Sequence, residues 1–270
     1  MTDAPRESFS ELPCRAFSPD GTRARRHPVA VESPLEIVVN GRPCAVLMRT
    51  PGEDVALAAG WCLSEGIIES KADLASIAYC GEADSSAVKV TLTAERLAAM
   101  GGEIDRSRFI SVSSCGLCGK RSLDELIPAL KPVESAATVG AEALAAMPET
   151  LRSAQKLFAL TGATHAAGLF SAEGRLLASA EDIGRHNALD KASGGMLLTE
   201  RLGEAACAVV TGRASLEMVL KAARANLPVL AAVSATTTAA VELADRLGMT
   251  LVAFLRGRSM NVYTRPDRIR

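Results

Sequence analysis

CAVVTGRASLEMVLKAARANLPVLAAV, residues 207–233, places two short apolar runs on either side of an amphipathic segment. The runs Cys207–Thr211 and Pro228–Val233 are bounded by turn residues, which is typical of buried strands. Between them, Ser215–Ala225 has helical periodicity, and Ser215 suits the position just before the first turn of a helix. A strand, a helix and a strand in this order predict a right-handed crossover between parallel strands.

The same alternation continues on both sides of this unit. Towards the C-terminus follow a helix at Thr237–Leu247 and a strand at Leu251–Leu255. Upstream lie a helix at 150–160, a hairpin with its turn at Glu173-Gly174, and a helix at about 187–202. Residues 149–264 are therefore predicted to form a three-layer α/β/α sandwich, in which an antiparallel pair precedes parallel strands.

The preceding residues, 31–130, predict a small α+β domain. Asn40-Gly41 joins two apolar runs and is a strong hairpin signal. A helix is predicted to begin after Pro51-Gly52 and to end near Gly66. Further elements are expected as strands at 77–80, 87–92 and 109–112 and as a short helix at 95–100.

Two segments outside these domains are predicted to lack regular structure. Residues 1–30 are polar and rich in Pro, Gly and Ser, so we expect a disordered or loosely attached tail. Residues 131–148 are rich in alanine but contain Pro132, Gly140 and Pro148, which is typical of a linker between domains. A chain of 270 residues is long enough to bury two separate cores.

Composition limits the class of protein. Hydrophobic residues make up 48% of the chain, as in globular proteins, and the net charge of -1 argues against broad nucleic-acid binding. Seven scattered cysteines do not form a disulfide framework. The N-terminus lacks the apolar core of a secretory signal, and the longest uncharged run, Ala225–Val241, is interrupted by polar residues. We therefore expect a cytoplasmic protein without a membrane segment.

Cys115 and Cys118 form the only closely spaced pair of thiols, in SCGLCGK at 114–120. The pair is predicted to lie between a strand end and a helix start, beside Lys120 and Arg121. Positive charge of this kind favours the thiolate, which is the nucleophilic form. Buried cysteines that only pack are the alternative, but packing explains neither the glycines nor the basic residues.

The densest polar segment is EDIGRHNALDK, residues 181–191. On a helix, His186 would share one face with Asp182 and Asp190, and a histidine between carboxylates can act as a base or an orienting group. Gly184 before Arg185 also suits a backbone that holds an anion. A solvated first turn with surface ion pairs remains the alternative, and His165 is equally compatible with a core and a functional role.

Three loops at strand ends are expected to meet at one edge of the second-domain sheet. They follow Ala180, Thr211 and Leu255, and ligands of doubly wound folds bind at this edge. Arginine holds phosphate through forked hydrogen bonds. The sequence therefore predicts a pocket for a phosphate-rich ligand, lined by Arg185, His186, Arg213, Arg256 and Arg258.

Several motifs occur together in an order that resembles the formate dehydrogenase accessory sulfurtransferase family (FdhD). Besides the segments at 114–120 and 181–191, they are TGRASLEMVLK at 211–221, AVSATTTAAVELA at 232–244 and FLRGRSMNVYT at 254–264. The resemblance spans residues 33–264. It implies a cytoplasmic homodimer that takes sulfur from a cysteine desulfurase to the bis-molybdopterin guanine dinucleotide cofactor of the formate dehydrogenase catalytic subunit.

The resemblance also assigns roles to residues. It implies that Cys115 carries the persulfide, that Cys118 is its partner, and that a guanine nucleoside diphosphate would mimic part of the cofactor. The cofactor-binding loop would consist of Phe254, Leu255, Arg256, Gly257, Arg258 and Ser259. One departure is TGATH at 161–165, where a second glycine is expected before the threonine.

The family's second domain is similar to cytidine deaminase. Zinc deaminases need an H-x-E and a later P-C-x-x-C, and neither follows His165 or His186 here. We therefore predict no metal site. A thioredoxin-like oxidoreductase, a non-catalytic molybdenum-cofactor chaperone and a structural zinc site are the alternatives, the last of which has only two of four usual ligands.

Overall fold

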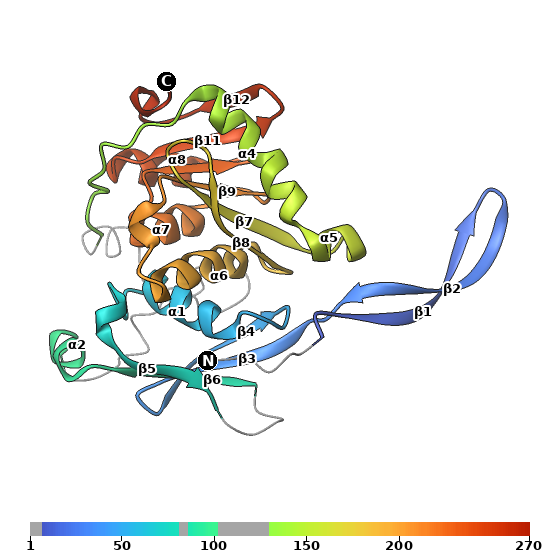
Figure 1. Cartoon of the computed structure of the whole chain (residues 1–270), viewed down its shortest axis with the longest axis horizontal. Coiled ribbons are helices and arrows are strands. Elements are labelled where there is room, and N and C mark those ends of the chain that lie inside the picture. Colours follow the sequence, from blue (N-terminus) through green and yellow to red (C-terminus); the bar gives the residue numbers. More distant parts are fainter. Residues whose placement is uncertain (1–6, 81–85, 102–129) are drawn as a thin grey trace.

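The computed structural model describes residues 7–80, 86–101 and 130–270. Its elements form two larger sheets with helices between and above them, and a long hairpin that projects from one side (Figure 1). Cys115 and Cys118, together with the strand predicted at 109–112, lie outside the described residues.

The larger sheet has six strands in the order β12-β11-β10-β9-β7-β8. Its centre is the predicted parallel set, β9 (Cys207–Val210), β10 (Val229–Ala232) and β11 (Thr250–Arg256). The predicted antiparallel pair is also present, as β7 (His165–Phe170) and β8 (Leu176–Asp182). An unpredicted strand, β12 (Ser259–Val262), turns back from β11 along the opposite edge.

Helices cover both faces of this sheet, as the strand and helix order predicts. On one face lie α6 (Arg185–Leu198), α7 (Leu216–Arg224) and α8 (Thr238–Arg246). On the other lies α4 (Ala141–Ala154), followed by the short α5 (Lys156–Thr161). The mixed α/β architecture is thus confirmed, whereas the likeness to cytidine deaminase stays a prediction.

Helix α4 corrects the predicted linker at 131–148, because it begins at Ala141 and continues through Pro148. Proline inside a helix costs roughly 3 kcal/mol, since it removes a hydrogen bond and crowds the preceding turn. Leu144, Met147 and Leu151 are buried against the sheet, and each contributes about 1.5–3 kcal/mol. Packing therefore outweighs the local cost of Pro148, and the helix ends only at Ala154.

The smaller sheet has the order β4-β3-β6-β5. Its first hairpin, β3 (Ser33–Val39) and β4 (Arg42–Arg49), turns at Asn40-Gly41, where both residues have positive φ as the sequence predicts. The remaining elements of this half are α1 (Asp54–Ser64), β5 (Leu74–Tyr79), β6 (Ala87–Leu92) and α2 (Ala94–Ala99). Short 3-10 turns occur at Lys71–Asp73, Leu202–Glu204 and Pro266–Arg268.

The prediction of a disordered tail is wrong for residues 9–30. They form an antiparallel ribbon of β1 (Phe9–Ser18) and β2 (Gly21–Ala30) that extends away from the body (Figure 1). Side chains on both faces of the ribbon are largely exposed, including Leu12 and Phe17. Strand prediction depends on one buried face, and a ribbon without one lacks that signal.

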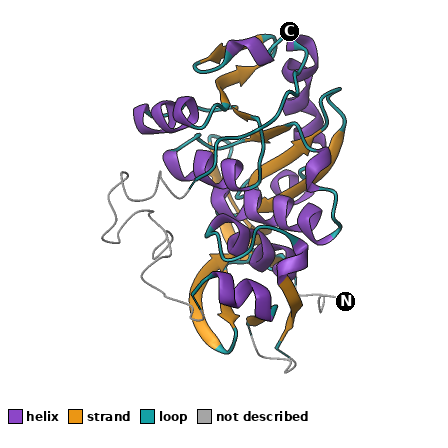
Figure 2. Ribbon diagram, turned by 90° about the vertical axis from the view of Figure 1, so that its left-hand side faces the viewer, coloured by secondary structure: helices purple, strands orange, loops and turns teal. Residues whose placement is uncertain are grey.

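The core does not divide at the expected domain boundary. One cluster of buried residues runs from the smaller sheet through α1, α6 and α7 to the larger sheet, and a second cluster lies under α4. Figure 2 shows the resulting stack of layers from the side. Since α1 packs directly on α6, the two halves form one continuous structure. Within the described ranges, no helix is both long and apolar enough to cross a membrane.

Candidate functional site

The candidate site lies where the parallel strands of the larger sheet end. The loop after β9 leads from Thr211 to Ser215, and the loop after β10 leads to Thr237. A bridge between Ala214 and Thr236 ties these two loops together. Because β7 is antiparallel to β9, its first residue, His165, lies at the same edge.

Arg185, His165 and Gly212 meet at this edge. A Cβ atom at Gly212 would lie 3.0 Å from Arg185 Cδ and 3.5 Å from His165 Nδ1, so glycine leaves room for both side chains. Thr211 Oγ1 lies 3.5 Å from His165 Nδ1 and accepts a hydrogen bond of 2.9 Å from the Ala166 backbone. The buried Nε of Arg185 has no hydrogen-bond partner in the part of the chain described. Arg185 is thus a half-buried cation available to an anion.

The imidazole of His165 is held in its neutral form. Burial lowers its pKa, and the positive charge of Arg185 lowers it further, while Asp182 acts in the opposite direction. A neutral imidazole can donate one hydrogen bond and accept another.

His186 lies behind this edge rather than in it. Its Nε2 is 3.4 Å from the Glu217 carboxylate, and the side chain is 20% exposed. Burial, followed by Lys221, Arg185 and His165, lowers its pKa to about 3, so the contact is not an ion pair at neutral pH. The Nε2 atom has no hydrogen-bond partner among the described residues. The structure therefore does not bring His186 together with the exposed arginines.

The carboxylates of segment 181–191 join the two halves of the molecule. Asp182 accepts hydrogen bonds from the backbone of Thr50 and Gly184, and it pairs with Lys191 at 2.8 Å. Asp190 pairs with Lys221 at 2.6 Å and accepts a hydrogen bond from Ser64 of α1. These ion pairs are buried, so the solvated first turn considered from the sequence is not what the structure contains.

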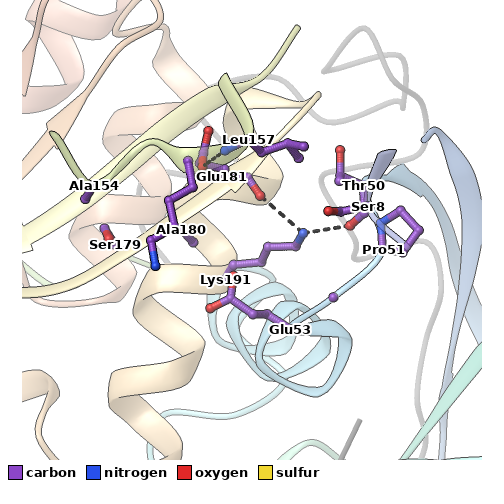
Figure 3. A pocket seen from close by; sticks show the side chains of 12 residues that line it. Ser8, Thr50, Pro51, Glu53, Ala154, Leu157, Ser179, Ala180, Glu181 and Lys191 are labelled. Atoms are coloured by element: carbon purple, nitrogen blue, oxygen red, sulfur yellow. Dashed lines mark hydrogen bonds between the residues drawn. The ribbon is translucent and has the colours of Figure 1, made fainter. Parts of the chain in front are cut away.

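A small pocket of about 230 Å³ lies at this junction, next to Lys191 (Figure 3). The Lys191 ammonium donates to the backbone carbonyls of Thr50 and Glu181. The Glu181 carboxylate accepts from the backbone of Leu157 and Phe158 at the start of α5. Since the Lys191 ammonium and the Glu181 carboxylate both have hydrogen-bond partners within the protein, we assign these two residues a structural role.

The predicted cofactor-binding loop at 254–259 is the tight turn between β11 and β12. Phe254 and Gly257 have positive φ, and a bulge interrupts the pairing of the two strands before Arg256. Arg256 donates to the Val233 carbonyl at 3.0 Å, which keeps it at the sheet edge. Leu255 is fully buried, in the cluster under α4, so it does not contribute exposed surface to a ligand site.

The other two arginines are exposed. Arg213 directly follows Gly212, the residue against which Arg185 packs, whereas Arg258 extends towards Glu142 at the start of α4, 3.4 Å away. Ser259 is exposed and pairs with Arg256 across the turn. The edge therefore gathers Arg185, Arg213 and Arg256, while Arg258 points to a neighbouring surface.

A larger pocket, of about 590 Å³, opens beside this edge. His165, Thr211, Val233 and Gly257 contribute from the sheet edge, and the opposite wall comes from α4 and α5, including Arg152 and Phe158. The sequence prediction missed this wall because part of α4 was assigned to a linker. The spacing of Leu144, Met147 and Leu151 is the signal that could have revealed a helix facing the sheet.

Cysteines in the described ranges differ in exposure. Cys62 and Cys207 are buried, and burial raises the pKa of both thiols, which makes them poor nucleophiles. Cys44 is also buried, Cys80 is partly exposed, and Cys14 is exposed on the ribbon. Residues 7–80, 86–101 and 130–270 contain no group of three His, Cys, Asp or Glu side chains placed to hold a metal ion.

Comparison with known proteins places this arrangement in context. The "Sulfur carrier protein FdhD" of Mycobacterium tuberculosis is 48% identical to this chain over 265 residues, covering 94% of this chain and 96% of the relative. The protein of the same name from Mycolicibacterium paratuberculosis is 50% identical, and the match covers 91% of this chain and 93% of the relative. The one from Streptomyces coelicolor is 44% identical, and the match covers 93% of this chain and 92% of the relative.

A solved structure is similar over its whole length. It is a protein from Desulfotalea psychrophila, provisionally described as a formate dehydrogenase accessory protein, with a TM-score of 0.78 and 25% identity. The match covers 98% of this chain and 100% of that one. The model of the FdhD/NarQ family matches residues 30–270. The chain therefore belongs to the FdhD/NarQ family.

Proposed function

We propose that this protein is a sulfurtransferase that carries persulfide sulfur from a cysteine desulfurase to a molybdenum cofactor destined for formate dehydrogenase. The observation that carries the proposal is the match to relatives named sulfur carriers over more than nine-tenths of the chain. The Cys115/Cys118 pair supplies the chemistry, since it is the one closely spaced pair of thiols in the sequence. The buried Cys62 and Cys207 are unsuited to that task.

The first step is a thiol–persulfide exchange. The Cys115 thiolate attacks the outer sulfur of the desulfurase persulfide and forms a new sulfur–sulfur bond. The bond between the two donor sulfurs breaks, and the desulfurase cysteine leaves as a thiolate. Cys115 then carries one additional sulfur, and no net oxidation has occurred.

The second step delivers the sulfur. The Cys118 thiolate attacks the Cys115 sulfur, so that a disulfide forms between the two residues and hydrosulfide is released to the acceptor. A cellular dithiol must reduce this disulfide before the next cycle. The bound acceptor, bis-molybdopterin guanine dinucleotide, is the substrate of this step.

The edge of the larger sheet fits the phosphates of such a substrate. Arg185 is half-buried and unpaired among the described residues, and Arg213 and Arg256 lie at the same edge. Cations in a partly desolvated setting bind phosphate more strongly than exposed ones. We assign Arg258 a peripheral role, because it is exposed and faces Glu142. On this proposal the protein acts in the cytoplasm as a homodimer.

Mass spectrometry tests the first step. The full chain is incubated with a cysteine desulfurase and free cysteine, and the persulfide is mapped after alkylation. Sulfur on Cys115 is expected, with none in Cys115→Ala, while Cys14→Ser controls for an exposed thiol outside the pair. Persulfide retained by Cys115→Ala would sink the proposal.

Two further measurements address the alternatives. A thioredoxin-like oxidoreductase would reduce insulin disulfides, and we expect no such activity above that of a free thiol. A non-catalytic cofactor chaperone would still activate formate dehydrogenase in cells as the Cys115→Ala/Cys118→Ala double variant. We expect that variant to fail.

A further inference from the structure

The ribbon of β1 and β2 is the part of the molecule whose side chains the fold uses least. Its strands pair along their full length, from Phe9 with Ala30 to Ser18 with Gly21, and it extends away from the body (Figure 1). An isolated two-stranded hairpin is at best marginally stable in water. The FdhD/NarQ family model begins at residue 30, so nearly all of the ribbon precedes the matched range. An exposed arm of this length is suited to hold another molecule.

One face of the ribbon carries cations and apolar groups but no carboxylate. Residues directly opposite each other in an antiparallel pair share a face, and every second residue of a strand returns to it. The face that we call the cationic face consists of four opposed pairs, namely Ser10 with Val29, Leu12 with His27, Cys14 with Arg25, and Ala16 with Arg23. β1 contributes an uncharged stripe to this face, and β2 contributes the cations. The opposite face is mixed, since Glu11 lies there together with Arg15 and Arg26.

The arginines of the cationic face have no counter-ion among the described residues. Arg23 and Arg25 are exposed, and neither has a hydrogen bond or an ion pair within the described ranges. They stand two residues apart on a strand, so their Cα atoms are about 6.7 Å apart and their charges repel each other. Leu12 and Val29 on the same face are 48% and 40% exposed. The complementary surface therefore presents carboxylates beside apolar side chains.

A second copy of the chain does not supply that surface through its own ribbon. Two-fold symmetry brings the same patch of both subunits together, so a contact between two cationic faces opposes like charges. The face is also small for a stable interface. A strand of 10 residues is roughly 33 Å long and two strands are about 10 Å wide, which gives ~330 Å² against the ~800 Å² per partner that stable interfaces use. This area fits a transient contact with a partner that also touches the body.

The ribbon stands beside the carboxyl-end edge of the larger sheet. β2 packs against α5, and Phe158 of α5 lines the 590 Å³ pocket at that edge. The chain that flanks the thiol pair on both sides lies elsewhere, because Arg96 of α2 and Lys131 share the carboxylate of Glu69. In Figure 1, α2 and the ribbon lie on opposite sides of the molecule. A protein bound to the ribbon is therefore brought to the edge that we assign to the substrate phosphates.

We propose that the cationic face of the ribbon docks the protein that receives the sulfurated cofactor, through an acidic surface with apolar side chains. On the proposed function, on which this inference rests, that recipient is the catalytic subunit of formate dehydrogenase. Docking supplies no chemistry of its own. It holds the recipient next to the substrate edge, so that the cofactor passes over a short distance.

Binding of the full chain to the cofactor-free catalytic subunit of formate dehydrogenase, measured by biolayer interferometry, tests the inference. Arg23→Glu/Arg25→Glu should weaken binding about tenfold or more, because two attractive charges become repulsive. The affinity of the unaltered chain should fall when the salt concentration is raised. The affinity of the double variant should fall less, since the screened attraction is already absent.

Arg15→Glu/Arg26→Glu is the matched control, because it makes the same change in net charge on the opposite face of the same ribbon. It should weaken binding by less than about threefold, since exposed charges are screened over about 10 Å. The inference is overturned if the unaltered chain does not bind the recipient. It is equally overturned if the two double variants bind with the same affinity.

Two further measurements identify a different occupant of the cationic face. Sedimentation of Arg23→Glu/Arg25→Glu as a monomer, where the unaltered chain is a dimer, would assign the face to a second copy. Slower sulfur loading from the desulfurase, with unchanged binding to formate dehydrogenase, would assign it to the sulfur donor. Either result overturns the inference, whereas normal loading of Cys115 with weakened recipient binding supports it. Absence of sulfur on Cys115 in the unaltered chain is instead a failure of the proposed function, so the two failures are distinguishable.

Discussion

Gly194 of α6 lies so close to the carbonyl oxygen of Ala56 in α1 that any Cβ atom at residue 194 would overlap it. The reciprocal contact is equally close, since a Cβ atom at Gly60 would overlap the Asp190 carbonyl. The two helices therefore meet through their backbones. This contact sets the distance between the smaller sheet and the candidate site.

The contact predicts opposite effects for two neighbouring glycines. Gly194→Ala should lower the free energy of unfolding by about 1–3 kcal/mol, because the helices must separate. Gly195→Ala should be neutral or raise it by roughly 0.5–1 kcal/mol, since its Cβ would make only an ordinary 3.9 Å contact with Ala56. Urea unfolding of both variants provides the measurement. Equal effects would show that the helix packing is not set by Gly194.

The local sequence predicts most of the larger sheet. Short apolar strands alternate with the amphipathic helices α7 and α8 from Cys207 to Arg256, and each crossover needs only local signals. Asn40-Gly41 likewise determines a turn that needs no tertiary support. These elements agree with their predictions because local preference and tertiary packing favour the same structure.

Other features depend on contacts that a single segment does not reveal. Pro148 is a local signal against a helix, yet the burial of Leu144 and Leu151 maintains α4. Arg185 and His186 are adjacent in sequence, but one faces the sheet edge and the other lies against Glu217. The sequence places both at a helix start, and only the packing of α7 separates their roles.

The buried ion pair of Lys221 with Asp190 predicts a large effect on stability. Burial opposes the charge on Lys221, but the carboxylates of Asp190, Glu65 and Glu217 raise its pKa overall. Lys221→Met leaves a buried carboxylate without its partner and should cost about 3–5 kcal/mol. Lys71→Met, which removes an exposed pair with Glu200, should cost less than about 1 kcal/mol. Chemical denaturation checks both values, and equal losses would contradict the assignment.

His186 predicts a dependence of stability on pH. Its folded-state pKa of about 3 lies below the ordinary 6.5, so the unfolded chain binds a proton that the folded chain does not. Stability should fall as pH decreases from about 6.5 towards 3, by at most about 1.4 kcal/mol per pH unit from this group. His186→Gln should show a shallower slope over that window in urea unfolding. His27→Gln, on the ribbon, serves as the control. Equal slopes of stability against pH for His186→Gln and the unaltered chain would refute the prediction.

Arg185 and Arg258 are predicted to contribute unequally to phosphate binding. Arg185 has a buried Nε without a described partner, whereas Arg258 is 90% exposed beside Glu142. Arg185→Gln should weaken GDP binding by about tenfold or more, because a charge-assisted hydrogen bond is lost in a partly desolvated site. Arg258→Gln should weaken it by less than about threefold, since surface charges are screened.

Guanosine carries no phosphate, so it separates this loss from a change in the 590 Å³ pocket beside the sheet edge. Arg185→Gln should bind guanosine as tightly as the unaltered chain does, and its GDP affinity should approach that of guanosine. Raising the salt concentration should weaken GDP binding less in Arg185→Gln than in Arg258→Gln, since one of the phosphate contacts is already absent. A parallel loss of guanosine and GDP affinity would mean that Arg185 supports the pocket through its contact with Gly212 and His165 instead of binding the phosphates.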